Sequence, residues 1–482
     1  MKIYHYLGAI TLSIMLILTV ACNQAIPTTA PVEVEAQAAA TEAPAEVEVE
    51  AQAATEAPAE EVASVPVELE FTIWTFDVEQ VQQYIDDWEK TAPLPVSGTL
   101  HDVDWGQYHD TMTAQFVAGT APDIMYASDH WLQEWASAGW LVPLKTVFPE
   151  DEVNKLTADM FPFTLEGMTF NGEIYGLPYY SDPIAFVYNT RMYEEAGIAE
   201  PPQSWEDVLE HSRILKEAGV VTYPIGFGWS QDEPFSIEVV TAMLMSRGDE
   251  FFDNELNPTF VTGEGEPILD STLAQHITWV KTALDEGLID PESLTRDGVV
   301  DGQSVMAGTQ AYGMSRASGL AAWQDPATSA EAGNLKMITI PDSTGVTLGF
   351  VRFYAATSKL AERDQAAKEA AWDFFKYFGG PGPQGDYPVV RQWALKWGLG
   401  FGPEPLYGDS EIREAFGAWG DVELLEETAK TARARKLSPW YSAWDVFSRA
   451  ELQRAYLGQI SVEEALVNIA NQWSSLRKDY EE

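Results

Sequence analysis

The chain has 482 residues, 46% of them hydrophobic, so it is long enough to form two domains with cores of their own. Its formal net charge of -47 argues against a nucleic-acid partner, because phosphate contacts need clusters of Lys and Arg. A neutral, polar or cationic ligand is favoured instead, and the single cysteine excludes an intrachain disulfide.

The first 21 residues are typical of an export signal. Lys2 gives a positive start, and the apolar run over residues 6–20 is shorter than the ~18 residues expected of a membrane-spanning helix. The run ends in Leu18-Thr19-Val20-Ala21-Cys22, which resembles a lipobox, although Thr19 stands where that pattern prefers Leu, Val or Ile. We expect residues 1–21 to be a signal peptide and Cys22 to carry a lipid anchor; an ordinary signal with an incidental cysteine is the alternative.

Residues 22–65 form a candidate linker. The segment after Cys22 is rich in Ala, Glu, Val, Pro and Thr and has no aromatic residue, and VEVEAQAAATEAPAE at 32–46 recurs one alanine shorter at 47–60. This composition cannot form a packed core, so we expect a disordered acidic tether that lifts the folded part off the membrane. A solvated interaction tail is the alternative.

The folded part is expected to begin at residue 66 with alternating strands and helices. A strand over 68–76 and a helix over 78–88 indicate a parallel sheet, whose carboxyl-end edge is where ligands collect. Trp74 lies at that edge and is a candidate ligand contact, or else a core residue. Asp129 opens a later helix, where it binds ligand hydroxyls or only caps the helix. We reject a metal cluster near residues 101–109, because the strand alternation points neighbours to opposite faces.

Residues 176–205 contain the most informative stretch. A Gly-Leu-Pro turn leads into an aromatic strand over 179–188 and then a helix that ends at Gly197. Tyr180 and Asp182, at the turn into the strand, can face a cleft, with core packing as the alternative. The loop 228–235 offers Trp229, Glu233 and Phe235 before another helix, although acidic residues at a helix start are also favoured by its dipole.

Several segments, in this order and spacing, resemble the family 1 extracellular solute-binding proteins, the sugar-binding proteins of ABC importers: GTAPD at 119–123, AGWLVPL at 138–144, the stretch 176–205, MAGTQAYGMSRASGL at 306–320 and GQISVEEAL at 458–466. Several relatives carry a stacking tryptophan shortly after the fourth segment. Arg316 lies near that place here, so the ring is missing unless Trp323 substitutes for it. Counting back from the last segment places Trp444 near a sugar-contacting ring.

The resemblance implies an α/β fold of two lobes, each a sheet flanked by helices, with the ligand between them. We expect 66–180 plus 316–378 in one lobe and 181–315 plus 379–482 in the other. Gly349 and Phe350, at the start of a strand over 349–357, complete the expected ligand contacts. Arg316 can donate to hydroxyls or to a carboxylate, or lie on the surface.

The expected function is capture of a carbohydrate, an oligosaccharide above all, and delivery to the transmembrane subunits of an ABC permease. Aromatic rings cover the apolar face of a sugar, polar side chains bind its hydroxyls, and the lobes close over it. We expect an extracytoplasmic, membrane-anchored monomer without catalysis, cofactor or metal. A secreted glycoside hydrolase that uses two carboxylates is the main alternative, and a surface adhesion module is a third.

Overall fold

The computed structural model describes residues 65–482 except 232–234, 297 and 343. The expected signal peptide, Cys22 and nearly all of the expected tether therefore lie outside the described residues. Within the described part of the chain, no helix combines the length and the apolar character needed to cross a membrane.

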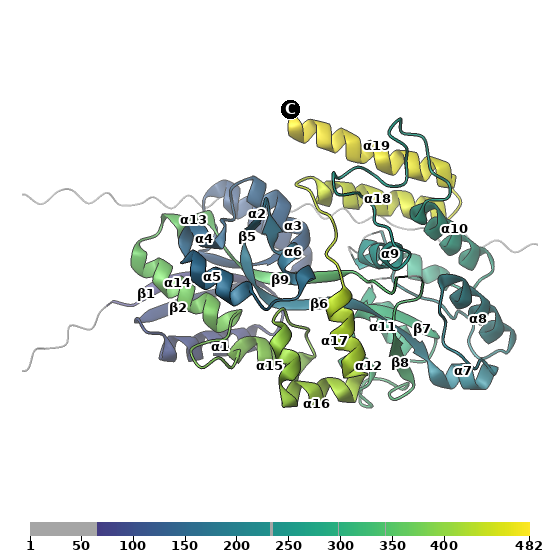
Figure 1. Cartoon of the computed structure of the whole chain (residues 1–482), viewed down its shortest axis with the longest axis horizontal. Coiled ribbons are helices and arrows are strands. Elements are labelled where there is room, and N and C mark those ends of the chain that lie inside the picture. Colours follow the sequence, from purple (N-terminus) through teal and green to yellow (C-terminus); the bar gives the residue numbers. More distant parts are fainter. Residues whose placement is uncertain (1–64, 232–234, 297, 343) are drawn as a thin grey trace, which may run out of the picture. The chain divides into compact units, whose positions relative to one another are not determined.

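A mixed sheet runs through the described structure (Figure 1). β1 (Val67–Trp74) pairs in parallel with β2 (Val96–Val103) and with β3 (Ile124–Ser128). β9 (Gly349–Ala356) pairs antiparallel with β3, and β6 (Gly176–Asn189) pairs antiparallel with β9. β7 (Tyr312–Arg316) and β8 (Leu335–Ile338) both pair antiparallel with β6. A separate hairpin consists of β4 (Thr169–Phe170) and β5 (Glu173–Ile174). The predicted α/β class is confirmed.

β6 links two parts of the sheet, because its two halves have different partners. Residues 176–183 pair with β9, whereas residues 184–189 pair with β7 and β8. Its side chains also divide: Leu177 and Tyr179 belong to one hydrophobic core, and Ile184 and Phe186 to another. The predicted strand at 179–188 is thus part of a longer strand that passes from one core to the next.

The first core packs helices against β1, β3 and the adjoining parts of β6 and β9. Trp88 and Phe374, from helices far apart in the sequence, meet there edge to face with 5.2 Å between ring centroids. The helices before β6 and directly after β9 are α1 (Val78–Thr91), α2 (Trp105–Ala118), α3 (Asp129–Ser137), α4 (Leu144–Val147), α5 (Glu150–Thr157), α6 (Pro162–Gly167), α13 (Ser358–Glu362) and α14 (Gln365–Phe378).

The second core surrounds the other half of β6 and includes the C-terminal helices. In this core α8 (Trp205–Glu217) begins with a capping box, in which Ser204 and Asp207 satisfy each other's backbone N–H groups. The helices between β6 and β8 and at the C-terminus are α7 (Thr190–Ala196), α8 (Trp205–Glu217), α9 (Phe235–Ser246), α10 (Thr272–Asp285), the 3₁₀ helix η1 (Pro291–Leu294), α11 (Gly298–Met306), α12 (Gly319–Trp323), α18 (Tyr441–Tyr456) and α19 (Val462–Glu481).

A third core joins the β7–β8 region to the helices after residue 387. Phe401 and Phe416 meet within it, with 5.8 Å between ring centroids. Its C-terminal elements are α15 (Pro388–Trp397), the 3₁₀ helix η2 (Glu404–Gly408), α16 (Ser410–Trp419) and α17 (Val422–Thr431).

Residues 316–378 were expected to belong to the first lobe, but the buried residues among them do not all pack in the first core. Leu320 and Met337 pack in the third core and Leu348 and Phe350 in the second, whereas the first core resumes only at Val351. The reason is that β7 and β8 pair with the second half of β6, which keeps residues 316–350 away from the first core.

Candidate ligand-binding site

A cavity of about 590 Å³ lies where the first and third cores face each other. This volume is within the range of small-molecule sites. Its wall combines aromatic rings, small residues, neutral polar groups and two arginines. The lining residues are Trp74, Thr75, Phe76, Trp105, Tyr179, Tyr180, Gly302, Gln303, Met306, Ser315, Arg316, Ser318, Gly319, Ala322, Trp323, Arg352 and Leu399.

One wall comes from the carboxyl end of β1 and the start of α2. Trp74 is the last residue of β1, and its ring meets that of Trp105 edge to face at 5.0 Å. The Asp104 side chain accepts the backbone N–H of Gly106 at 3.0 Å and so caps the start of α2. Trp105 is 36% exposed, whereas Trp74 is 7% exposed, so Trp105 is the more accessible ring.

The opposite wall is built around Trp323, the last residue of α12. Its indole fits against glycines: a Cβ at Gly313 would lie 2.7 Å from the Trp323 ring, and one at Gly302 would lie 3.4 Å from it. Arg316 ends β7 just before this helix and is 34% exposed at its side chain. A stacking-size ring is therefore present in this region, at Trp323 and not at Arg316.

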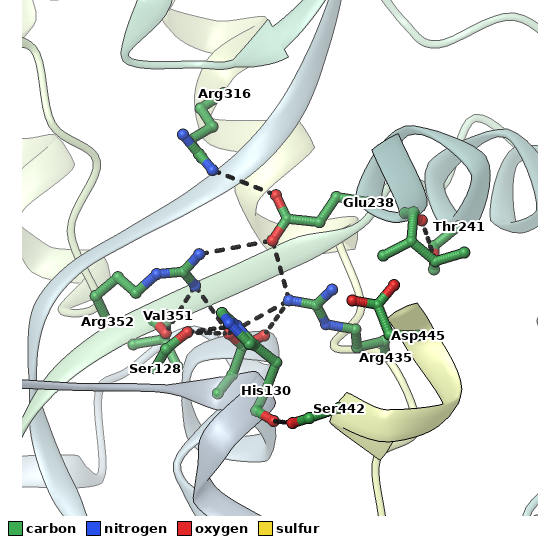
Figure 2. A network of polar contacts seen from close by, with 12 residues as sticks. Ser128, His130, Glu238, Thr241, Arg316, Val351, Arg352, Arg435, Ser442 and Asp445 are labelled. Carbon is green, nitrogen blue, oxygen red and sulfur yellow. Dashed lines mark hydrogen bonds and ion pairs between the residues drawn. The ribbon is translucent and has the colours of Figure 1, made fainter. Parts of the chain in front are cut away.

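A buried charge cluster lies behind the arginines of the cavity (Figure 2). Arg352 Nη1 donates to Asp129 Oδ1 at 2.8 Å, and its Nη2 lies 3.5 Å from Glu238 Oε1. Arg435 Nη2 lies 3.2 Å from Asp129 Oδ2 and 3.0 Å from Glu238 Oε1. Arg316 Nη2 lies 3.5 Å from Glu238 Oε2. The cluster joins α3, α9, β7, β9 and the segment that precedes α18.

The arginines keep the buried carboxylates ionised. Burial alone raises the pKa of Asp129, but the charge of Arg435, the hydrogen bond with His130 and the charge of Arg352 hold it well below its usual range. Burial also raises the pKa of Glu238, and Arg435, Arg316 and Arg352 outweigh it, so this pKa is lowered too. Burial lowers the pKa of His130 to about 4, so its ring is neutral at pH 7.

Several residues expected from the sequence lie at or beside the cavity. Trp74, Tyr180 and Arg316 line it, but Asp129 does not, because its oxygens accept from Arg352 and Arg435. Phe350 lies under Arg352 and Arg316, whose guanidinium carbons are 4.8 Å and 5.3 Å from its ring centroid. It supports the arginines and does not line the wall.

Asp182 and Gly349 serve packing. Asp182 is buried and accepts the backbone N–H of Ser318 at 3.3 Å, and burial raises its pKa to about 7. A Cβ at Gly349 would lie 2.4 Å from the Phe163 ring, so this glycine allows α6 to approach β9 closely. Neither residue lines the cavity, in contrast to the expectation from the sequence.

Two expected rings belong to the second core. Trp444 is fully buried against Phe252 and Trp473, at 4.9 Å and 5.5 Å between ring centroids, and its Nε1 donates to the Ile469 carbonyl. Trp229 is 2% exposed, and its ring meets Phe227 at 5.4 Å. Both lie away from the cavity because apolar neighbours surround them. Glu233 lies outside the described residues, and so does the side chain of Phe235 at the start of α9.

The sequence reasoning missed Trp105, Gln303 and Arg352 in the wall, and Glu238 and Arg435 in the cluster. Two of these carried a usable signal. Trp105 lies two residues after the end of β2, which pairs in parallel with β1, so it lies at the same sheet edge as Trp74. Arg352 interrupts the apolar strand GFVRFYAA, and an arginine within a buried strand requires a buried partner.

The chain resembles known proteins in sequence and in fold. Residues 77–385 match the family described as bacterial extracellular solute-binding protein. A binding protein of Brucella abortus (strain 2308) is 24% identical over 358 residues, which are 74% of this chain and 80% of that protein. Maltose-bound MalE3 of T. maritima has a TM-score of 0.70 at 17% identity, covering 85% of this chain and 100% of that one. An ABC transporter solute-binding protein of Agrobacterium vitis S4 with bound D-mannitol has a TM-score of 0.65 at 17% identity, covering 86% and 99%.

The structural likeness confirms the predicted periplasmic-binding-protein-like fold. The family consists of solute-binding proteins that do not catalyse reactions, which excludes the glycoside-hydrolase alternative. The match covers well over half of the chain. The chain therefore belongs to the family of bacterial extracellular solute-binding proteins.

Proposed function

We propose that this protein captures a carbohydrate, an oligosaccharide above all, in the cavity between Trp105 and Trp323 and delivers it to the permease of an ABC importer. The main support is that rings from two different cores face one cavity. A sugar has an apolar C–H face that stacks on rings, and its hydroxyls find donors and acceptors in the wall, among them Gln303 and Ser315. The sugars and polyols named with the solved relatives belong to those proteins, but they agree with this choice.

The proposal includes closure of two lobes. We place the crossings near 180–184 in β6 and near 350–351 in β9, where the buried side chains change core. A ligand that touches Trp74 on one side and Trp323 on the other stabilises the closed form by its extra affinity for that form. The closed form is then what a permease recognises.

The proposal also includes anchoring to the membrane surface through lipidated Cys22, as a monomer. The support is the lipobox-like sequence at the end of the apolar run and a Streptomyces antibioticus relative named as a lipoprotein, 25% identical over 213 residues. In cells that express the full chain, Cys22→Ala should release the protein into the soluble extracytoplasmic fraction. Retention of the variant in the membrane fraction would contradict the anchor and leave the sugar proposal unaffected.

The sugar proposal is tested by a thermal-shift screen over mono- and oligosaccharides and polyols. A ligand at 100 times its dissociation constant adds about 2.7 kcal/mol of stability, so the best sugars should raise Tm clearly. Trp323→Ala should then weaken the best hit at least tenfold, because it removes the ring of one wall. Tyr480→Ala is the matched control, since Tyr480 is 51% exposed and does not line the cavity. Equal affinities in both variants would remove Trp323 from the site.

A further inference from the structure

The end of α15 lies at the cavity and touches both of its walls. Leu399, just beyond this helix, lines the cavity. Gly398 fits against α12, where a Cβ on this glycine would lie 2.8 Å from the Ala321 Cβ. Trp397, the last residue of α15, meets the ring of Phe76 with 5.5 Å between centroids, and Phe76 lines the cavity. Trp397 therefore lies at the rim, one ring outside the wall.

The Trp397 ring is open to solvent although it is large and apolar. It is 42% exposed, which makes it the most exposed tryptophan of the described residues. Single exposed apolar residues are common on protein surfaces and need no function. Trp397 differs from such a residue because Phe76 connects it to the cavity wall, so that its surface continues the aromatic part of the site.

Polar contacts hold this exposed ring in one orientation. Trp397 Nε1 donates to Asp77 Oδ2 at 2.8 Å, and Lys396 Nζ lies 2.7 Å from the same oxygen. The Lys396 ammonium also lies over the indole, 5.3 Å from the ring centroid. A side chain that is already fixed loses little conformational entropy when a ligand binds to it. The indole is thus a preorganised surface.

The backbone of Asp77 is strained in the position that orients this indole. Asp77 precedes α1 with a φ of 44°, a left-handed conformation that is uncommon for residues other than Gly, although Asp adopts it more readily than most. Among its described contacts, its carboxylate binds Trp397 and Lys396 and does not cap α1. Strained residues of this kind cluster at ligand sites, because the surrounding structure holds them there.

Resting on the proposed function, we infer that Trp397 is a stacking platform outside the cavity, and that the ligand is an oligosaccharide long enough to run from the cavity over Phe76 onto this indole. The apolar C–H face of an outer sugar unit would cover the ring. Lys396 Nζ has three N–H groups and bonds Asp77 and Gln80, so a third N–H can donate to a hydroxyl of the same unit. Short sugars fill the cavity and do not reach Trp397.

The test is isothermal titration along three series from disaccharide to hexasaccharide: the α-1,4-glucose oligomers, the β-1,4-glucose oligomers and the β-1,4-xylose oligomers. In the best series the affinity should rise at least tenfold at the length that reaches Trp397. Trp397→Ala should reduce this rise to threefold or less and leave the shorter members within about twofold of the parent. Trp397→Phe keeps an aromatic face without the Nε1 donor, so it should retain more of the rise than Trp397→Ala.

Two controls separate the platform from the cavity. Trp323→Ala should weaken all members of the series, because it removes a ring of the cavity wall. Tyr480→Ala should leave every affinity unchanged, since this exposed ring does not line the cavity. A parent affinity that is the same for short and long members, or a Trp397→Ala variant that keeps the full rise or weakens all members equally, would overturn this inference and leave the proposed function standing. No binding in any series would contradict both.

Hydroxyl-radical footprinting gives a second measurement, which uses the parent protein and does not depend on the stability of the variants. A saturating hexasaccharide of the best series should protect Trp397 from oxidation at least threefold, whereas a saturating disaccharide should leave its oxidation unchanged. Equal oxidation of Trp397 with and without the hexasaccharide would refute the platform.

Discussion

Replacing Arg435 by methionine tests the buried charge cluster. The Arg435 guanidinium lies 3.2 Å from Asp129 and 3.0 Å from Glu238, and these carboxylates are 0% and 1% exposed. Methionine keeps an apolar stem of similar length but leaves two buried charges with one ion pair fewer each. Removing one partner of a buried pair costs about 3–5 kcal/mol. We expect a loss near the lower end, about 3 kcal/mol, because Arg352 still contacts both carboxylates.

The stability cost of replacing Arg435 should depend on pH. The pKa values of Asp129 and Glu238 are lowered in the folded protein, so both groups stabilise it at pH values above their unfolded pKa values, about 3.9 and 4.3. This stability is lost as the pH falls through the lower folded values. Without Arg435 the two pKa values rise, so the difference between parent and variant should be largest at pH 7 and should shrink below about pH 4.

Urea unfolding at pH 7 and at about pH 3, below the unfolded pKa values of both carboxyls, measures both effects. The surface variant Arg213→Met is the control, because its ion pair with Glu286 is half-exposed and such pairs contribute about 0–1 kcal/mol. Adding Glu238→Gln to Arg435→Met should recover part of the loss, since it removes one uncompensated charge. A loss below 1 kcal/mol at pH 7, or an equal loss at both pH values, would refute the role assigned to Arg435.

Three further substitutions test the packing around the site. Burial raises the folded pKa of Asp182 to about 7, above its unfolded value. Its contribution to stability is therefore complete below about pH 4 and is lost as the pH rises through about 7. Relative to Asp182→Asn, the parent should lose on the order of 4 kcal/mol of unfolding free energy between about pH 4 and about pH 8, measured by urea titration. Gly400→Ala would place a Cβ 2.2 Å from the Ser181 carbonyl oxygen and should lower Tm by several degrees, whereas Gly408→Ala meets no atom within 4 Å and should leave Tm nearly unchanged. Trp444→Ala should cost about 3–5 kcal/mol of stability while the surviving folded protein keeps its sugar affinity, and a selective loss of affinity would return Trp444 to the site.

Local elements were predictable because their signals are local. The aromatic strand that forms part of β6 and the helix after it are both visible over a few residues of sequence, and the structure has both. Trp74 was also within reach, since the strand pattern places it at the carboxyl end of β1. Such features need no knowledge of which distant segments meet.

The sorting of tryptophans into core and cavity was not predictable in this way. The burial of Trp444 depends on contact with Trp473, and that of Trp229 depends on contact with Trp279. Both partners are more than 20 residues away in the sequence, so a local pattern cannot identify them. Arg435 is a stronger case. It lies in the basic, polar stretch KTARARKLS, typical of a surface loop, yet it is 7% exposed because α3 and α9 bring carboxylates to it.

The cluster and the cavity are coupled through the elements they share. Asp129 belongs to α3, which packs in the first core, and Glu238 belongs to α9, which packs in the second, so the ion pairs of Arg435 connect elements of both cores. Arg352 and Arg316 take part in both the cluster and the cavity wall. If lobe closure brings these elements together, weakening the cluster lowers the fraction of closed protein, and the apparent affinity for sugar falls by that same fraction. Arg435→Met should therefore weaken sugar binding without touching the sugar, and it should do so by a similar factor for every sugar that binds.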